Sequence, residues 1–224
     1  MVEWGGLENR CSLMRTQGSN PCLSATILYM MHIGLYSGSF NPFHNGHLQV
    51  ATTMLKKYHF DQIWFLVSPN NPLKKAEDLI DETLRLEMVQ AVVDEYNKRN
   101  HCEDFQTSNI EFDLPKPSYT YITLRKLRQI YPDNKFSLII GGDNLACFDK
   151  WKNYEEILQN HALYVYPRNK QTITNLKGDI IYTSMPFINI SSTEIRSKIK
   201  NGEHVEDLLP ATVLSFILKK HLYQ

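Results

Sequence analysis

The sequence predicts an α/β protein built around a doubly wound parallel sheet, with a C-terminal helical segment. Short apolar runs alternate with segments of helical periodicity, glycine-containing turns such as Ser37-Gly38-Ser39 and Gly141-Gly142-Asp143 follow two of the runs, and two helical patterns end the chain. Strands that alternate with helices form βαβ units, whose crossovers are right-handed and whose sheet is parallel. The predicted arrangement is Rossmann-like, and such sheets bind ligands at the carboxyl ends of their strands.

The strands are predicted from compact apolar runs bounded by polar, glycine or proline residues. The run that precedes Ser68-Pro69-Asn70-Asn71-Pro72 is an example, because the two prolines cannot continue a buried strand. The expected strands are, in chain order, His32–Tyr36, Ile63–Val67, Asp104–Phe112, Phe136–Ile140, Leu163–Tyr166 and Ile180–Tyr182.

The helices are predicted from apolar residues spaced three and four apart. The first helix is expected to bury a face made of Leu48, Ala51, Leu55 and Tyr58. Asp81 can cap the second helix, whose expected face contains Leu84, Met88, Ala91, Val92 and Glu95. The expected helices are Gly46–Tyr58, Asp81–Asn97, Tyr119–Ile130, Ser192–Lys200 and Ala211–His221.

The composition excludes several classes of protein. Hydrophobic residues make up 42% and charged residues 21% of the 224, which is ordinary for a globular chain. Lys+Arg and Asp+Glu are both 24, so no overall positive field favours a nucleic-acid partner. No apolar run reaches membrane-spanning length, and the four cysteines lack CxxC spacing. We therefore expect a cytoplasmic protein with reduced thiols and small-molecule substrates, without nucleic-acid or membrane partners; the sequence leaves oligomerisation open.

Residues 1–29 are predicted to be a non-native, disordered N-terminal extension, ahead of a single domain at residues 30–224. The extension lacks a clear amphipathic period, and Gly18-Ser19-Asn20-Pro21 can be encoded by a sequence that contains the GGUUCGAAUCC of a transfer-RNA T-arm. We interpret it as a translated upstream tRNA gene, with the true start at Met30 or Met31. A genuine flexible extension is the alternative. Deleting residues 1–29 is expected to leave activity and Tm essentially unchanged.

The most informative motif is the string Gly38-Ser39-Phe40-Asn41-Pro42-Phe43-His44-Asn45-Gly46-His47, between an expected strand and an expected helix. Gly38 and Ser39 allow a ligand to approach the backbone closely, and N–H groups at a helix start favour an anion. His44 and His47 are three residues apart, so both rings can project toward one point and donate to phosphate oxygens. Neither is expected to be a core residue. For this spacing alone, surface histidines at a capped turn or an HxxH metal pair are the alternatives.

This string resembles the (H/T)xGH signature of the nucleotidyltransferase superfamily, and about residues 31–224 are similar to the bacterial nicotinate-nucleotide adenylyltransferase family. The resemblance implies adenylyl transfer from ATP to nicotinate mononucleotide, giving nicotinate adenine dinucleotide (NaAD) and pyrophosphate in NAD biosynthesis. We expect Mg²⁺ to be brought with ATP, because no cluster of carboxylates in the sequence offers a dedicated metal site.

A second string, Phe187-Ile188-Asn189-Ile190-Ser191-Ser192-Thr193-Glu194-Ile195-Arg196, is similar to the family's ISSTxIR. Ser191 or Ser192 is a good N-cap, and the Arg196 guanidinium can bind phosphate oxygens. For this segment alone, a capped helix with a solvated arginine is the alternative. The resemblance implies that His44, His47 and Arg196 are catalytic. It implies that ATP is bound by Gly38, Ser39, Phe40, Ile190, Ser191, Ser192 and Thr193.

Two further motifs imply the acceptor site. Pro117-Ser118-Tyr119-Thr120-Tyr121-Ile122-Thr123-Leu124 is similar to the family's PSYTxxTL, which holds the nicotinate carboxylate, and Ser118 is a possible helix cap. Gly142-Asp143 followed by Trp151 is similar to the family's GxDxxxxxxxW, where a carboxylate can accept from ribose and an indole can stack on pyridine. Core packing for Trp151 and helix capping for Asp143 are the alternatives. The implied acceptor-binding residues are Ser118, Tyr119, Thr120, Asp143 and Trp151.

One segment departs from the family pattern. The family usually has a His-Lys or His-Arg pair in a loop such as PxxxPHK, where this chain has Asn70-Asn71-Pro72-Leu73-Lys74-Lys75. The histidine is absent, and we assign Lys74 or Lys75 to the triphosphate of ATP. Two lysines on a solvated loop are an equal alternative.

Three other functions compete with this interpretation. A sister enzyme would use nicotinamide mononucleotide or another phosphorylated acceptor such as phosphopantetheine. A nucleotide-binding regulator would bind ATP without turnover. A zinc protein would use His44 and His47, although further ligands at sensible spacing are lacking in the sequence.

Overall fold

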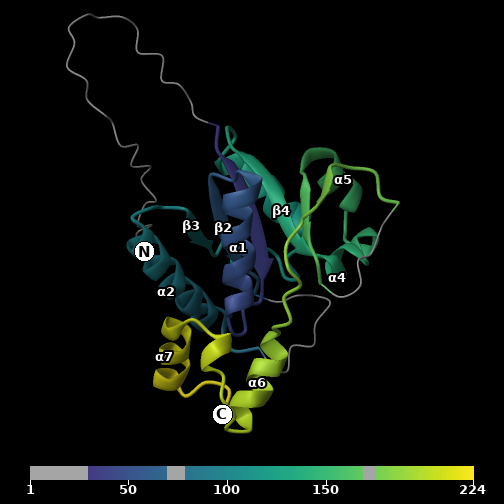
Figure 1. The fold of residues 1–224 in the computed structure, drawn as a ribbon. Coiled ribbons are helices and arrows are strands. Elements are labelled where there is room, and N and C mark those ends of the chain that lie inside the picture. The colour runs from purple at the N-terminus through teal and green to yellow at the C-terminus, as the bar shows by residue number, and fades with distance from the viewer. Residues whose placement is uncertain (1–29, 70–78, 169–174) are drawn as a thin grey trace, which may run out of the picture.

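A six-stranded sheet forms the centre of the computed structural model, which describes residues 30–69, 79–168 and 175–224 (Figure 1). The strands lie in the order β3-β2-β1-β4-β5-β6, and every neighbouring pair is parallel. The chain winds outward from β1 in one direction and, from β4, in the other, which confirms the predicted Rossmann-like α/β fold. The strands are β1 His32–Gly38, β2 Gln62–Val67, β3 Phe105–Ser108, β4 Lys135–Gly141, β5 Leu163–Tyr166 and β6 Ile180–Tyr182. The expected N-terminal extension, residues 1–29, lies outside the described residues.

Helices cover both faces of this sheet. They are α1 Asn45–Tyr58, α2 Glu82–Asn100, α3 Thr120–Ile130, α4 Gly142–Leu145, α5 Tyr154–Asn160, α6 Ser192–Lys200 and α7 Ala211–Lys220, with short 3₁₀ turns η2 Phe148–Lys150 and η3 Glu206–Leu208. α1 and α2 share one apolar core with α6 and α7, and α3, α4 and α5 contribute to a second core. The protein is therefore a three-layer sandwich with a core on each side of the sheet.

The side chains of β2 show how one strand serves both cores. Ile63 and Phe65 belong to the first core, and Trp64 and Leu66 belong to the second. Every residue of β2 is buried. This explains the continuous apolar run Ile63–Val67, since a strand covered on both faces has no polar side to alternate with.

Most element ends agree with the sequence-based expectations, and β5, β6 and α6 have the predicted bounds. The strand expected at Asp104–Phe112 is shorter, because β3 ends at Ser108, opposite the end of β2, and the Phe112 N–H bonds to Asn109 O in a turn. Helices α4 and α5 were not predicted; they are only one or two turns long, too short for a clear period.

The predicted buried helix faces were partly wrong. In α1, Val50 and Met54 are buried with Ala51, whereas Leu48, Leu55 and Tyr58 are only partly buried. In α2, Met88 and Val92 are buried as predicted, but Arg85 is also buried, with 1% of its surface exposed. Arg85 can lie there because its guanidinium donates to backbone carbonyl oxygens of four residues, Ser39, Ser68, Pro69 and Ile80.

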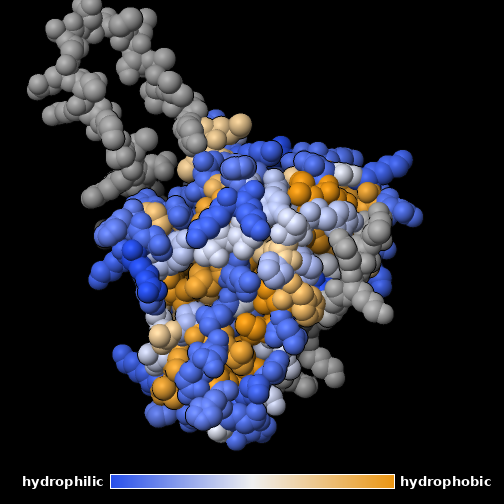
Figure 2. Space-filling view, viewed as in Figure 1, coloured by the Kyte–Doolittle hydropathy of each residue, from blue (hydrophilic) through white to orange (hydrophobic). Residues whose placement is uncertain are grey.

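The C-terminal helical segment is part of the first core. Hydrophilic side chains cover most of the face shown in Figure 2, and hydrophobic ones show between them, in the lower part around the C-terminal helices and also at the middle and upper right of the view. Ile195, Val213 and Ile217 are buried in the core that α2 also lines, and α7 packs directly on α2. In the described part of the chain, no helix has the length and hydrophobicity needed to cross a lipid bilayer.

Candidate active site

A cavity of about 640 Å³ opens at the carboxyl ends of β1 and β4. These strands are neighbours from which the chain winds in opposite directions, and sheets of this order bind ligands at that position. Pockets of this volume hold ligands of nucleotide size. The cavity is lined by most of the sequence-predicted residues: Gly38, Ser39, Phe40, His44, His47, Ser118, Tyr119, Thr120, Asp143, Trp151, Ser191, Ser192, Thr193 and Arg196.

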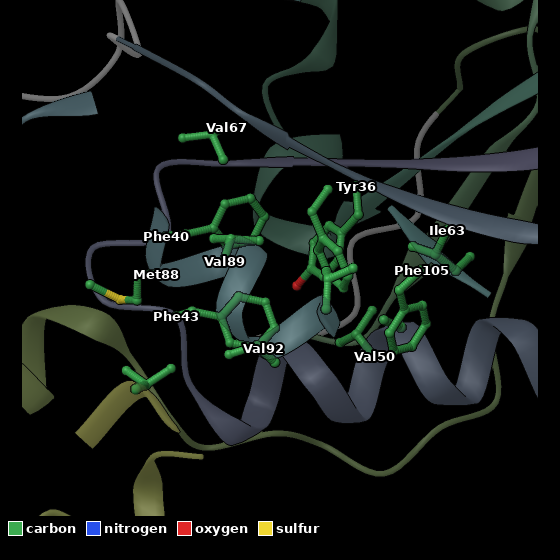
Figure 3. Packing of buried hydrophobic residues seen from close by; sticks show 14 of the residues in the cluster. Tyr36, Phe40, Phe43, Val50, Ile63, Val67, Met88, Val89, Val92 and Phe105 are labelled. Atoms are coloured by element: carbon green, nitrogen blue, oxygen red, sulfur yellow. The ribbon is translucent and has the colours of Figure 1, made fainter. Parts of the chain in front are cut away.

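Two phenylalanines hold the loop that follows β1. Phe40 and Phe43 are 1% and 0% exposed, point into the first core (Figure 3), and lie with their ring centroids 5.8 and 5.4 Å from that of Phe65. Phe40 has a φ of 46°, a left-handed conformation that is unfavourable for a side-chain-bearing residue. Burial of its ring offsets that cost. Gly46 is required here, because a Cβ would lie 2.8 Å from Ile188 Cγ2.

The imidazole rings of His44 and His47 stack at the start of α1. The backbone N–H of His44 donates to Nδ1 of the His47 ring at 3.2 Å, which orients that ring. His44 is 3% exposed, so the expectation that it lies outside the core was wrong; the loop that carries it is itself packed into the core. Burial, followed by the positive charge of Arg168, lowers the pKa of His44 to about 3. Its imidazole is therefore neutral at pH 7.

The start of α6 is bonded directly to the loop after β1. Ser191 is the N-cap, and its Oγ accepts from the Glu194 N–H at 3.2 Å. Ser192 Oγ donates to Pro42 O at 3.0 Å, and Arg196 Nη1 donates to Asn41 O at 2.9 Å. Arg196 is therefore more than a solvated arginine on a capped helix. The two motifs, about 150 residues apart in the chain, form one wall of the cavity.

Among the described residues that are predicted to bind ATP, only Ile190 does not line the cavity. Ile190 is partly buried against the first core instead. Lys74 and Lys75 lie outside the described residues.

Glu111 organises the start of α3. Ser118 Oγ donates to its Oε2 at 3.3 Å and Thr123 Oγ1 donates to its Oε1 at 3.1 Å. Burial raises the pKa of the Glu111 carboxyl, although hydrogen bonds from Ser68, Thr123 and Ser118 act in the opposite direction. The prediction of Ser118 as a helix cap was wrong: the N-cap is Tyr119, without a side-chain bond, and the Ser118 hydroxyl bonds to Glu111. Thr120 is the first residue of the helix and lines the cavity.

Asp143 and Trp151 lie on the wall formed by β4 and the segment after it. Asp143 is in the first turn of α4, whose N-cap is Gly141, so Asp143 is not the cap; its Oδ2 lies 4.0 Å from Arg168 Nε. The Trp151 ring packs against Phe148, with centroids 4.8 Å apart, and its buried Nε1 has no hydrogen-bond partner within the described residues. Trp151 thus combines core packing with a place on the cavity wall.

The cavity also contains groups that sequence reasoning missed. Arg168 lies two residues after the end of β5. Its position could have identified it, because parallel sheets bind ligands at the carboxyl ends of their strands. Lys150 and Lys152 flank Trp151, and Lys152 Nζ lies 4.7 Å from the centre of the Tyr119 ring. Glu111 gave no sequence signal, because it is a single acid in a mixed segment.

A metal cage is not formed by the described side chains. Across residues 30–69, 79–168 and 175–224, no three His, Cys, Asp or Glu side chains gather where they could hold a metal ion. In this part of the chain a zinc site at His44 and His47 would therefore lack the third and fourth ligands that protein zinc sites use.

Comparisons with known proteins identify the family of the chain. The cytidylyltransferase-like family model matches residues 35–198. The chain is 45% identical over 198 residues to the "probable nicotinate-nucleotide adenylyltransferase" of Flavobacterium johnsoniae, and 46% identical over 198 residues to that of Flavobacterium psychrophilum; each alignment covers 87% of this chain and 100% of the relative. A solved structure of Plasmodium falciparum nicotinic acid mononucleotide adenylyltransferase complexed with NaAD has a TM-score of 0.68 and 19% identity, covering 86% of this chain and 97% of that one. That structural likeness supports the fold.

Proposed function

The chain belongs to the cytidylyltransferase-like family and, within it, to the nicotinate-nucleotide adenylyltransferases, and we propose that the cavity is its active site. The enzyme transfers the AMP moiety of ATP to nicotinate mononucleotide, giving NaAD and pyrophosphate in NAD biosynthesis. One observation carries the assignment of the site: the first turns of α6, with Ser192 and Arg196, are hydrogen-bonded to the loop that leads into the two histidines, at one cavity wall.

The proposed reaction is an in-line displacement at phosphorus. A 5′-phosphate oxygen of nicotinate mononucleotide attacks the α-phosphorus of ATP, and the bond from that phosphorus to the oxygen bridging the β-phosphate breaks. Pyrophosphate leaves with the electron pair of the broken bond. Because the nucleophile is already an anion, no general base is needed. Catalysis then rests on positioning and on stabilising the charge that develops on the leaving oxygen.

His44, His47 and Arg196 are the residues proposed to stabilise the pyrophosphate side. A neutral imidazole at His44 can donate one hydrogen bond to a phosphate oxygen, while the Arg196 guanidinium supplies positive charge. The N–H groups at the starts of α1 and α6 add further donors. The remaining cavity residues proposed to bind ATP are Gly38, Ser39, Phe40, Ser191, Ser192 and Thr193.

The start of α3 and Trp151 are proposed to bind the acceptor. Nicotinate carries a carboxylate that the N–H groups near Thr120 can bind, and Trp151 offers an aromatic face to the pyridine ring. Asp143 is proposed to accept from ribose hydroxyls. Nicotinamide cannot form the same charge-assisted bonds, and we expect the acid to be favoured by about 1–3 kcal/mol if its carboxylate is buried.

Mg²⁺ is proposed to enter as part of the ATP substrate, where it would neutralise phosphate charge. Two described carboxylates of the cavity already interact with protein groups, which favours an ion that arrives bound to ATP. Glu111 accepts hydrogen bonds from the hydroxyls of the α3 start, and Asp143 lies beside Arg168. A Mg²⁺ ion bound to the triphosphate needs only a few protein ligands, because it keeps several waters.

Product analysis with ATP and nicotinate mononucleotide tests the proposed function. We expect NaAD and pyrophosphate in equal amounts. A sister enzyme would release pyrophosphate only with nicotinamide mononucleotide or phosphopantetheine as the acceptor. A regulator would bind ATP without releasing pyrophosphate. Either result would overturn the proposal. Full activity after replacing both His44 and His47 by alanine would place the reaction outside this cavity.

A further inference from the structure

The end of the chain contacts the loop that precedes the histidines. Tyr223, the penultimate residue, donates from its hydroxyl to Asn41 Oδ1 at 2.7 Å, across 182 residues of sequence. Asn41 is 2% exposed, and Tyr223 packs partly buried against the first core. A bond from the end of a chain to a buried side chain three residues before His44 is a specific tertiary contact.

Two residues with a left-handed backbone conformation direct Tyr223 toward the loop after β1. His221, the C-cap of α7, has a φ of 52°, and Tyr223 itself has a φ of 63°. The N–H of Leu222 bonds to Ile217 O at 3.1 Å, which closes the end of the helix. The last residues therefore turn back toward α2 and the loop after β1, where Leu222 and Tyr223 join the core.

The same loop is held by three other side chains. Arg85 Nη1 donates to Ser39 O at 2.8 Å, Arg196 Nη1 to Asn41 O at 2.9 Å, and Ser192 Oγ to Pro42 O at 3.0 Å. These bonds fix the backbone, whereas Tyr223 bonds to the side chain of Asn41. Burial raises the pKa of the Tyr223 phenol, so the hydroxyl remains a proton donor at pH 7.

We propose that Tyr223 is a positioning residue for adenylyl transfer, which acts through Asn41 to hold His44 and His47 against the phosphates of ATP. Small displacements of catalytic groups cost large factors in rate, since the donors must meet the oxygen that gains charge in the transition state. The bond therefore contributes to turnover more than to binding of either substrate. This proposal rests on the proposed function.

The Tyr223→Phe variant tests it, because it removes one hydroxyl and keeps the ring in the core. We expect kcat for NaAD formation to fall about tenfold, as for the loss of one hydrogen bond to a buried side chain, while KM for ATP and for nicotinate mononucleotide changes less than about threefold. Tyr58→Phe is the matched control. It removes a hydroxyl that accepts from the Ser184 N–H at 2.8 Å, at the opposite end of α1, and should leave kcat unchanged. All assays are run well below the Tm of each variant.

A double-mutant cycle shows whether Tyr223 acts through Asn41. Adding Tyr223→Phe to Asn41→Ala should lower kcat no further, because the acceptor is already gone. Independent losses in the double variant, or an unchanged kcat in Tyr223→Phe alone, would overturn the proposal. A lower Tm with unchanged kcat would make Tyr223 an anchor of α7 only, which also overturns it. Wild-type protein that forms no NaAD would instead overturn the proposed function, and this role with it.

Discussion

The rings of His44 and His47 are stacked with their centroids 3.7 Å apart and their planes 21° from parallel. The stacking places both imidazoles at one point of the cavity wall, at the start of α1, and Gly46 between them leaves room for the His44 ring. Two imidazole donors at one point suit a leaving group with several charged oxygens. The first prediction follows from this arrangement.

Replacing either histidine by alanine should lower kcat by two or more orders of magnitude. The expectation corresponds to losing about 3 kcal/mol of transition-state stabilisation, as for a single oxyanion-hole donor. Steady-state kinetics of pyrophosphate release measure it. Because His44 is buried, His44→Ala should also lower Tm, whereas the more exposed His47 should tolerate the change better. A variant that turns over at nearly the wild-type rate would remove that histidine from the mechanism.

The buried His44 should make folding stability depend on pH. Its pKa is about 3 in the folded protein against 6.5 for an unperturbed histidine. Between these values the unfolded chain binds a proton that the folded protein does not, so acidification below pH 6.5 favours unfolding. The slope from this site is at most about 1.4 kcal/mol per pH unit.

Urea unfolding of wild type and His44→Gln, from about pH 7.5 to about pH 4.5, measures this slope. The wild type should lose more stability on acidification than the variant. Burial also lowers the pKa of His32 and of His161, but both histidines remain in the two proteins, so the difference reports His44. Parallel curves for the two proteins would contradict the prediction.

Trp151→Ala should raise KM for nicotinate mononucleotide much more than KM for ATP. Removing an aromatic platform costs roughly 1–3 kcal/mol, or about 5- to 150-fold, by analogy with base–aromatic stacking. Trp151→Phe keeps an aromatic face and should lose less. If Trp151→Ala raises KM for ATP alone, the indole belongs to the adenine side or only to the core.

Arg85→Met should destabilise the protein by at least about 2 kcal/mol, because it leaves buried carbonyl oxygens of the loops after β1 and β2 without their donor. The expected fall in Tm is roughly 4 °C or more for a chain of this length. Arg99→Met, near the exposed end of α2, is the matched control and should change stability by less than about 0.5 kcal/mol. Equal Tm values for the two variants would show that the Arg85 bonds are not stabilising.

Sequence patterns predicted the sheet and most helices because burial of one helix face leaves a local period, and burial of both faces of a strand leaves a continuous apolar run. The histidine string and the motif at the α6 start could be recognised because the residues of each motif are contiguous in the chain. The cavity residues near β4 were found through motif spacing, and Glu111 was missed because its partners Ser118 and Thr123 become neighbours only when α3 folds against the β3 loop.

Contacts that depend on tertiary structure could not be predicted. The burial of Arg85 has no signal in the sequence, since the carbonyl oxygens that it bonds lie on other loops. Tyr223 and Asn41 are 182 residues apart, and no local pattern connects them. The roles of Lys74 and Lys75 stay predictions, because they lie outside the described residues.

The acceptor preference of the wild-type enzyme tests the account most directly. The measurement is kcat/KM for pyrophosphate release with nicotinate mononucleotide and with nicotinamide mononucleotide, each at saturating ATP and Mg²⁺. We predict that the acid is preferred by at least about tenfold, which corresponds to about 1.4 kcal/mol from the donors at the start of α3. Equal values for the acid and the amide would contradict the Thr120 assignment, and release with the amide alone would contradict the proposed function itself.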